Sequence, residues 1–308
     1  RRWATNPLHQ RYPRLLPALH HRKEPDRSAR GHRARRAEDN RVGPLIASIL
    51  LNDLALSALL FIALWLISLR TKDPSFIDAW WALGVVVLAW SNYAQITTPS
   101  PHAFVLVALA TAWGLRLGIY LLWRWRKHGA DRRYAALAER AREKHGLGFA
   151  AFSLLWVFLP QLLLQFVAAL PVMLGQMPRT ATLGALAWTG AALGLFGILY
   201  EAIADAQLTR FTADPANAGK VMDCGLWRYS RHPNYFGELC AWWGIYLVAA
   251  ETGLGFWSLP GPLLLTFLLT RVSGAPTTEP HLRETRPGYE AYKTRTSAFI
   301  PWWPAAQN

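Results

Sequence analysis

The feature that most constrains this chain is a series of apolar runs, each long enough or nearly long enough to cross a bilayer. A helix needs about 20 mostly apolar residues to span about 30 Å of hydrocarbon. The hydrophobic fraction of 52% and the 16 Trp residues agree with this pattern, because indole rings gather at membrane–water boundaries. The predicted fold is an all-α, polytopic membrane helix bundle with about seven transmembrane helices. The runs lie at about 45–69, 76–96, 103–123, 149–174, 182–204, 234–250 and 256–272.

The distribution of Lys and Arg between these runs predicts the orientation of the bundle. If the first helix starts outside, the inside connections and the C-terminal stretch together hold 19 Lys and Arg, whereas the outside connections hold only Arg179. Basic residues collect on the cytoplasmic side of membrane proteins. We therefore expect the N-terminus outside and the C-terminus in the cytoplasm.

Residues 1–41 form a separate basic region with 12 Lys and Arg. Their composition, rich in Arg, His and Pro and without a helical period, predicts a disordered tail and disfavours nucleic-acid binding. The predicted orientation would place this positive charge outside, although basic residues collect on the cytoplasmic side. The chain also begins with Arg and not with Met. We therefore expect that 1–41 is not native, that translation starts near Val42, and that 42–308 is the membrane domain.

Ionisable residues inside the apolar runs are candidate functional residues, because burying a charge in a membrane is costly. Asp78 opens the second run and is interpreted either as a helix N-cap or as the polar wall of a substrate cavity. Arg116 and Tyr120 are four residues apart and share a helix face. Arg116 keeps its charge, so it needs an acid or a phosphate, and a site role is favoured over a structural ion pair. Glu201 and Asp205 also share one face, towards water or towards a ligand.

The sixth run opens with the sequence SRHPNYFGE at 230–238. Pro233 suits a first helical turn, whose free N–H groups bind anions. Asn234 and Glu238 share one face just below that turn. This pattern favours a phosphate at the helix start with a polar group deeper in. The alternative, a cluster of interfacial side chains that snorkel to water, would explain the arginines but not Glu238.

The stretch 277–303 contains Tyr289 and Tyr292 and ends in Ile-Pro-Trp-Trp. It either closes over the basic helix start or forms an interfacial helix with Trp anchors. No glycine-rich fingerprint follows a predicted strand, so a dinucleotide would have to bind among the helices. The two cysteines, Cys224 and Cys240, match no zinc spacing and predict no metal site.

The sequence GLWRYSRHPNYFGE at 225–238 resembles the steroid 5-alpha-reductase-like membrane proteins, specifically a bacterial branch. That superfamily also includes the delta-14 and delta-7 sterol reductases and the isoprenylcysteine carboxyl methyltransferases. The likeness covers nearly all of 42–308 and implies a cofactor site within 201–308. It also implies a location in a bacterial inner membrane, with the cofactor site facing the cytoplasm. The cofactor-binding positions that it implies are Glu201, Asp205, Arg231, His232, Asn234, Tyr235, Glu238, Tyr289 and Tyr292.

The resemblance also implies roles in the third span. Arg116 and Tyr120 match an Arg/Tyr pair of the reductases, and Asn234 and Glu238 match residues at the nicotinamide end. Steroid reductases place a Tyr where this chain has Trp113. An indole cannot act as a phenolic acid, so steroid specificity is not supported.

We expect an NADPH-dependent reductase of a carbon–carbon double bond, conjugated to a carbonyl, in a lipophilic substrate. Catalytic roles are expected for Arg116, Tyr120 and Glu238. Phosphates are expected at Lys220, Arg228, Arg231 and Arg271. One alternative is a methyltransferase that uses S-adenosylmethionine, which has no phosphates and needs fewer cations. Another is a non-catalytic lipid carrier or scaffold. The expected partners are the lipophilic substrate and membrane lipids.

Overall fold

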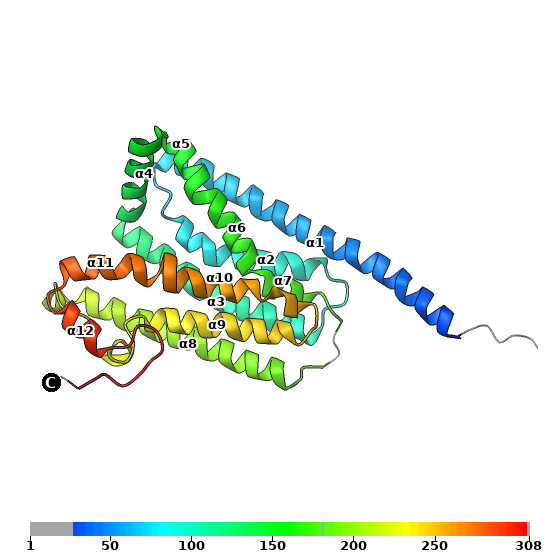
Figure 1. Cartoon of the computed structure of the whole chain (residues 1–308). Coiled ribbons are helices and arrows are strands. Elements are labelled where there is room, and N and C mark those ends of the chain that lie inside the picture. Colours follow the sequence, from blue (N-terminus) through cyan, green and yellow to red (C-terminus); the bar gives the residue numbers. More distant parts are fainter. Residues whose placement is uncertain (1–26, 180–181, 307–308) are drawn as a thin grey trace, which may run out of the picture. The chain divides into compact units, whose positions relative to one another are not determined.

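The computed structural model describes residues 27–179 and 182–306, and no strand occurs in these ranges. The all-α prediction is confirmed for this part of the chain. Contacts divide the chain into two units, Arg1–Leu45 and Ile46–Asn308. The α-helices in Figure 1 are α1 (Arg27–Thr71), α2 (Ile77–Gln95), α3 (Pro101–His128), α4 (Arg132–His145), α5 (Phe149–Phe152), α6 (Leu159–Ala168), α7 (Leu170–Gln176), α8 (Ala185–Ala213), α9 (Pro233–Ala250), α10 (Pro260–Phe267), α11 (Ala275–Thr285) and α12 (Tyr289–Arg295). The π-helices are η1 (Ser153–Phe158) and η5 (Leu268–Val272), and the 3-10 helices are η2 (Pro215–Asn217), η3 (Gly225–Arg228) and η4 (Gly255–Ser258).

Among the described residues, four helical segments are long and apolar enough to cross a membrane. They are Gly43–Thr71, Pro101–His128, Phe149–Ala168 and Ala185–Ala213. Their outer faces carry large apolar side chains that a soluble protein would bury, such as Leu59, Phe104 and Trp188, which are each more than 60% exposed. Such faces suit contact with lipid, which agrees with a membrane protein.

The other predicted runs are also helical but shorter. The run at 76–96 forms α2 and the run at 234–250 forms α9. The run at 256–272 is divided into η4, α10 and η5, and α10 starts at Pro260. Proline lacks the N–H that continues a helix and therefore favours a helix start.

Close packing between α8 and α9 brings the candidate site together. A Cβ atom at Gly197 would lie 2.3 Å from the backbone nitrogen of Ala241, and one at Gly244 would lie 2.3 Å from that of Gly194. The glycines of α8 therefore let the two backbones approach closely, as their spacing predicts. Figure 1 shows α3 running beside this pair, and α3 contacts both helices.

The N-terminal part of α1 differs from the sequence prediction. Residues 27–41 are helical, whereas the sequence predicts disorder over 1–41. Arg and Ala are frequent in this segment and have high intrinsic helix propensity. A search for apolar periodicity does not detect a helix that is built from such residues. Residues 1–26 lie outside the described part of the chain. Whether 1–41 is native stays a prediction.

The C-terminal segment packs on the loop before α9. The backbone N–H of Arg231 donates to the Ser297 carbonyl at 2.8 Å, and that of Trp302 donates to the Tyr229 carbonyl at 2.9 Å. Ser230 Oγ donates to the Phe299 carbonyl at 2.8 Å. Of the two interpretations of 277–303, the structure agrees with closure over the start of α9.

Candidate functional site

A buried ion cluster joins α3 to α8. Arg116 Nη1 donates to Asp205 Oδ2 at 2.6 Å, and the same guanidinium pairs with Glu201. Both acids are at most 5% exposed. Glu201 and Asp205 thus lie on one face of α8, as their spacing of four residues predicts, and this face is turned to Arg116. Arg116 faces acids, which is the structural ion pair that the sequence analysis disfavoured. The two carboxylates need a buried cation, and the guanidinium can reach both at once.

The cluster extends to α9 through Asn234 and Glu238. Asn234 Nδ2 donates to Asp205 Oδ1 at 3.3 Å, while its Oδ1 is buried without a partner in the described chain. Glu238 is partly exposed and makes no hydrogen bond or ion pair with any described residue, but its charge interacts with those of Glu201 and Arg116. With all groups ionised, three carboxylates share one guanidinium, which gives a net charge of −2.

The remaining residues of this predicted face have ordinary contacts. Tyr120 lies one turn beyond Arg116, and its hydroxyl lies 3.3 Å from Thr209 Oγ1. Trp113 is fully buried and packs edge-to-face on Trp242, with ring centroids 4.9 Å apart. Its indole N–H has no partner among the described residues.

A cavity of about 920 Å³ opens beside the start of α9. Seven of the predicted site residues line it: Lys220, Arg231, His232, Asn234, Tyr235, Tyr289 and Tyr292. Arg228 and Arg271 are exposed and do not line it, so their predicted phosphate contacts are not supported. Arg116, Tyr120, Glu201, Asp205 and Glu238 are not among the lining residues. Asn234 connects the cavity to the buried ion cluster.

Three cations that line this cavity form no ion pair with a described residue: Arg124, Lys220 and Arg286. The charge of Arg124 still interacts with those of Asp78, Asp131 and Asp205 without a direct ion pair. Sequence analysis missed Arg124 and Arg286 as site residues. Arg124 could have been found, because 116, 120 and 124 continue one face of α3 at a spacing of four. Arg286 follows α11 and carries no such signal.

Arg231 is held by the protein itself. Its Nε donates to Glu279 Oε1 at 3.0 Å, and its Nη1 donates to the carbonyls of Thr296 at 2.8 Å and Lys293 at 3.2 Å. His232 Nε2 lies 3.0 Å from the same oxygen of Glu279. Glu279 thus largely neutralises the charge of Arg231, which leaves less positive charge for the predicted contact with a phosphate. Glu279 was missed because nothing in the local sequence relates residues 231 and 279.

Hydrogen bonds from His232 and Arg231 hold the pKa of Glu279 at about 2, well below its usual value, even though burial opposes this. Tyr292 also supports the loop, since its hydroxyl donates to the Trp227 carbonyl at 2.5 Å and lies 3.2 Å from that of Ser230. Tyr292 therefore both stabilises the loop before α9 and lines the cavity.

Three aromatic residues complete the wall near α9. Tyr235 stacks on His232, with ring centroids 5.3 Å apart and planes 10° apart. The Tyr289 hydroxyl is buried without a hydrogen-bond partner among the described residues, and burial raises its pKa to about 12. Tyr289 therefore remains a neutral donor at physiological pH.

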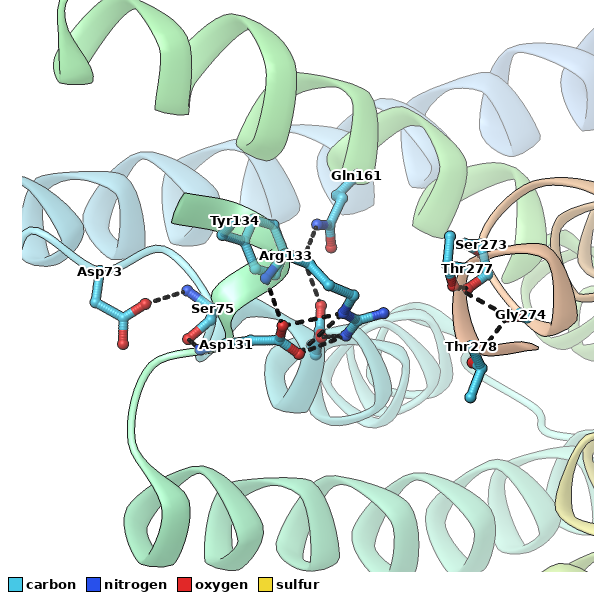
Figure 2. A network of polar contacts seen from close by, with 11 residues as sticks. Asp73, Ser75, Asp131, Arg133, Tyr134, Gln161, Ser273, Gly274, Thr277 and Thr278 are labelled. Atoms are coloured by element: carbon cyan, nitrogen blue, oxygen red, sulfur yellow. Dashed lines mark hydrogen bonds and ion pairs between the residues drawn. The ribbon is translucent and has the colours of Figure 1, made fainter. Parts of the chain in front are cut away.

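The opposite wall comes from α2 and α4. Asp78 accepts a hydrogen bond from the Tyr134 hydroxyl at 2.6 Å and pairs with Arg133 Nη2 at 3.3 Å. Gln161 Nε2 in turn donates to the Tyr134 hydroxyl at 3.1 Å. Figure 2 shows Gln161, Tyr134, Arg133 and Asp131 gathered at one place. Of the two interpretations of Asp78, the structure agrees with a cavity wall, because the N-cap of α2 is Phe76 and has no side-chain cap bond.

Two smaller cavities share residues with the large one. A cavity of about 610 Å³ shares Lys220 and Tyr292 with it and continues along Gly288 and Arg295. The other, of about 420 Å³, shares Asp131 and is lined by Tyr134 and by Phe149 and Phe152. The large cavity can therefore extend on both sides.

Comparison with known proteins identifies the family. The family described as "Protein of unknown function (DUF1295)" matches residues 64–296. The chain belongs to the DUF1295 family. This family is part of the steroid 5-alpha-reductase-like superfamily, which agrees with the resemblance seen at 225–238. All residues that line the large cavity fall within the matched range.

The chain is also similar to an uncharacterized protein of Schizosaccharomyces pombe. The two are 25% identical over 280 residues, which cover 80% of this chain and 78% of that protein. No solved structure matches the chain. The DUF1295 assignment thus rests on sequence, and the site geometry supplies the functional argument.

Proposed function

We propose that this DUF1295 protein is a membrane-embedded reductase that uses NADPH to reduce a carbon–carbon double bond, conjugated to a carbonyl, in a lipophilic substrate. The observation that carries the proposal is the cavity beside α9, which is lined by Arg124, Lys220 and Arg286, none of which forms an ion pair with a described residue. Unpaired cations around one cavity favour a ligand with several negative charges. NADPH has three phosphate groups, whereas S-adenosylmethionine has none.

The donor set fits such a cofactor. Lys220 lies where the large cavity meets the 610 Å³ cavity, so one ligand could extend through both. The first turn of α9 starts at Pro233 and adds free backbone N–H groups next to the cations. The unpartnered Asn234 Oδ1 can accept a hydrogen bond from a carboxamide N–H.

The buried ion cluster of Arg116, Glu201, Asp205 and Glu238 also suits the binding of a nicotinamide cofactor. When bound, the nicotinamide would supply a hydride to the β-carbon of the double bond and become positively charged. The carboxylates of Glu201, Asp205 and Glu238 outnumber the single cation Arg116 and lie just below Asn234, so those that are ionised would stabilise that positive charge. In this proposal Glu238 is the residue free to face the ring, since it has no hydrogen-bond partner among the described residues. Arg116 and Tyr120 position the carboxylates.

We further propose that α2, α9 and the segment 256–272 complete a bundle of seven spans, with the N-terminus outside and the cavity facing the cytoplasm. The bias of Lys and Arg between the connections supports this orientation. Cytoplasmic NADPH would then reach the cavity directly.

The proposal is tested by titrating the purified protein in lipid nanodiscs with NADPH and with S-adenosylmethionine. We expect saturable binding of NADPH and none of S-adenosylmethionine. NADH, which lacks one phosphate, should bind more weakly. Saturable binding of S-adenosylmethionine without binding of NADPH would replace the reductase by a methyltransferase.

A further inference from the structure

The wall of the large cavity formed by α2 and α4 contains an anionic acceptor that the proposed cofactor does not need. We propose that Asp78 binds a hydrogen-bond donor, an O–H or N–H group, on the head of the lipophilic substrate. The inference deepens the proposed function and rests on it for the identity of this cavity as the reaction site.

The contacts of Asp78 fix its orientation. Gln161 donates to the oxygen of Tyr134, so the Tyr134 O–H is directed to Asp78 Oδ1. Arg133 approaches the other oxygen, Oδ2. Residues from two helices, α4 and α6, thus hold the carboxylate in one place, and a fixed acceptor loses little entropy when a ligand binds.

The carboxylate has unused capacity towards the cavity. An ionised carboxylate offers about four acceptor positions, and two hydrogen bonds from described residues occupy two of them. The Asp78 side chain is 30% exposed, and it lines the 920 Å³ cavity. Neighbouring Asp131, by contrast, accepts from the backbone N–H, Nε and Nη2 of Arg133. Asp78 is therefore the acid of this wall that is available to a ligand.

The chemistry of Asp78 selects the class of head group. An alcohol, amide or ammonium group can donate to a carboxylate in a charge-assisted hydrogen bond. An ionised carboxylate or phosphate has no proton to donate to Asp78, and its charge would be repelled by the Asp78 carboxylate itself. Lys220 and Arg286, which the proposed function assigns to phosphates, line the same cavity but form no ion pair or hydrogen bond with Asp78. We therefore expect an alcohol- or amide-headed lipid and not a fatty acid.

The experiment compares two isoprenoid probes, farnesol and farnesyl methyl ether, which differ in the O–H donor. Binding is measured in nanodiscs for the wild type and for Asp78→Asn, Tyr134→Phe and Glu139→Gln. Wild type should prefer the alcohol by about 10-fold, the scale of one charge-assisted hydrogen bond. Asp78→Asn should reduce the preference to about 2-fold. Tyr134→Phe keeps the Asp78 carboxylate but removes one of the hydrogen bonds that fix its position. It should therefore reduce the preference for the alcohol less than Asp78→Asn does.

Glu139 is the matched control, because it is an acid on α4 that pairs with Arg142 and lines the 420 Å³ cavity but not the 920 Å³ cavity. Glu139→Gln should leave the preference unchanged. An equal preference in wild type and Asp78→Asn, in variants with unchanged thermal unfolding, overturns the proposal. So does an equal loss in Glu139→Gln.

A second arm tests whether the donor belongs to the cofactor. The 3-acetylpyridine analogue of NADPH lacks the carboxamide N–H. If Asp78→Asn removes the preference for NADPH over this analogue but keeps the preference for farnesol, the substrate assignment is overturned. If the farnesol preference depends on Asp78 but NADPH does not bind to the wild type, the proposed function fails and the Asp78 site stands.

Discussion

The two ionic clusters next to the cavity are built in different ways. The cluster of Arg116, Glu201 and Asp205 lies between long helices and leaves an excess of negative charge. The cluster of Arg231, His232 and Glu279 ties a loop to the C-terminal segment and is nearly neutral. The first can influence the charge of a ligand, whereas the second mainly holds the loop in place. A basic residue before a helix can therefore be paired with an acid of the protein itself, as Arg231 is with Glu279.

The largest expected effect comes from the helical cluster. Replacing Arg116 by Met leaves Glu201 and Asp205 buried without their cation. Loss of one partner from a buried ion pair costs about 3–5 kcal/mol in soluble proteins. We expect a strong decrease in thermal stability in detergent, together with loss of NADPH binding. Arg142→Met, at the exposed pair with Glu139, is the control and should unfold like the wild type. Equal stability of Arg116→Met and Arg142→Met would contradict the assignment of a buried cluster.

A smaller effect is expected from the loop cluster. Glu279→Gln keeps the size of the side chain but removes the charge that binds Arg231 and His232. Hydrogen bonds to charged groups contribute about 1.5–3 kcal/mol each, and the amide oxygen retains part of this. We expect a decrease of about 1–3 kcal/mol in stability and a more weakly held C-terminal segment, measured as faster hydrogen exchange over 289–303. Glu290→Gln, at an exposed pair with Arg283, should change neither quantity. Unchanged exchange in Glu279→Gln would show that Glu279 does not hold the segment.

The smallest expected effect is the pH dependence of the same contact. The pKa of Glu279 is about 2 in the folded protein and 4.5 in the unfolded chain, so the folded state binds its proton less readily. Its stabilising contribution is complete above about pH 4.5 and is lost as the pH falls towards 2. Between these values the wild type should lose more stability than Glu279→Gln. Parallel stability curves for the two proteins would mean that Glu279 has an ordinary pKa.

The difference between the clusters also explains what the sequence could predict. Glu201 and Asp205, like Arg116 and Tyr120, are four residues apart within continuous helices, so helical periodicity places each pair on one face. The all-α architecture and the apolar helices follow from the same local patterns. The contact of Arg116 with two acids could not be predicted in this way. The spacing of residues within one helix does not show which other helix lies opposite it.

The loop cluster depends on contacts between distant residues. Arg231 and Glu279 are 48 residues apart, and Asp78 and Tyr134 are 56 apart. No local sequence pattern predicts such pairs. The sequence therefore indicates a phosphate at Arg231 and gives no indication of Tyr134.

Arg124 could have been predicted, because it lies one turn beyond Tyr120 on the same face of α3. Arg228 was predicted from its charge and its place just before the start of α9, and Arg271 from its charge. Neither property shows that a side chain points into the cavity, and both side chains are exposed outside it.

The most direct test of the central claim is the affinity for NADPH of three proteins, measured by calorimetry in nanodiscs: wild type, the double variant Lys220→Ala/Arg286→Ala, and Arg228→Ala. Lys220 and Arg286 line the cavity, whereas Arg228 is an exposed arginine outside it. Each lost charge-assisted contact should weaken binding about 10-fold. The account predicts a loss of about 100-fold in the double variant and nearly wild-type affinity for Arg228→Ala. Wild-type affinity in the double variant would contradict it.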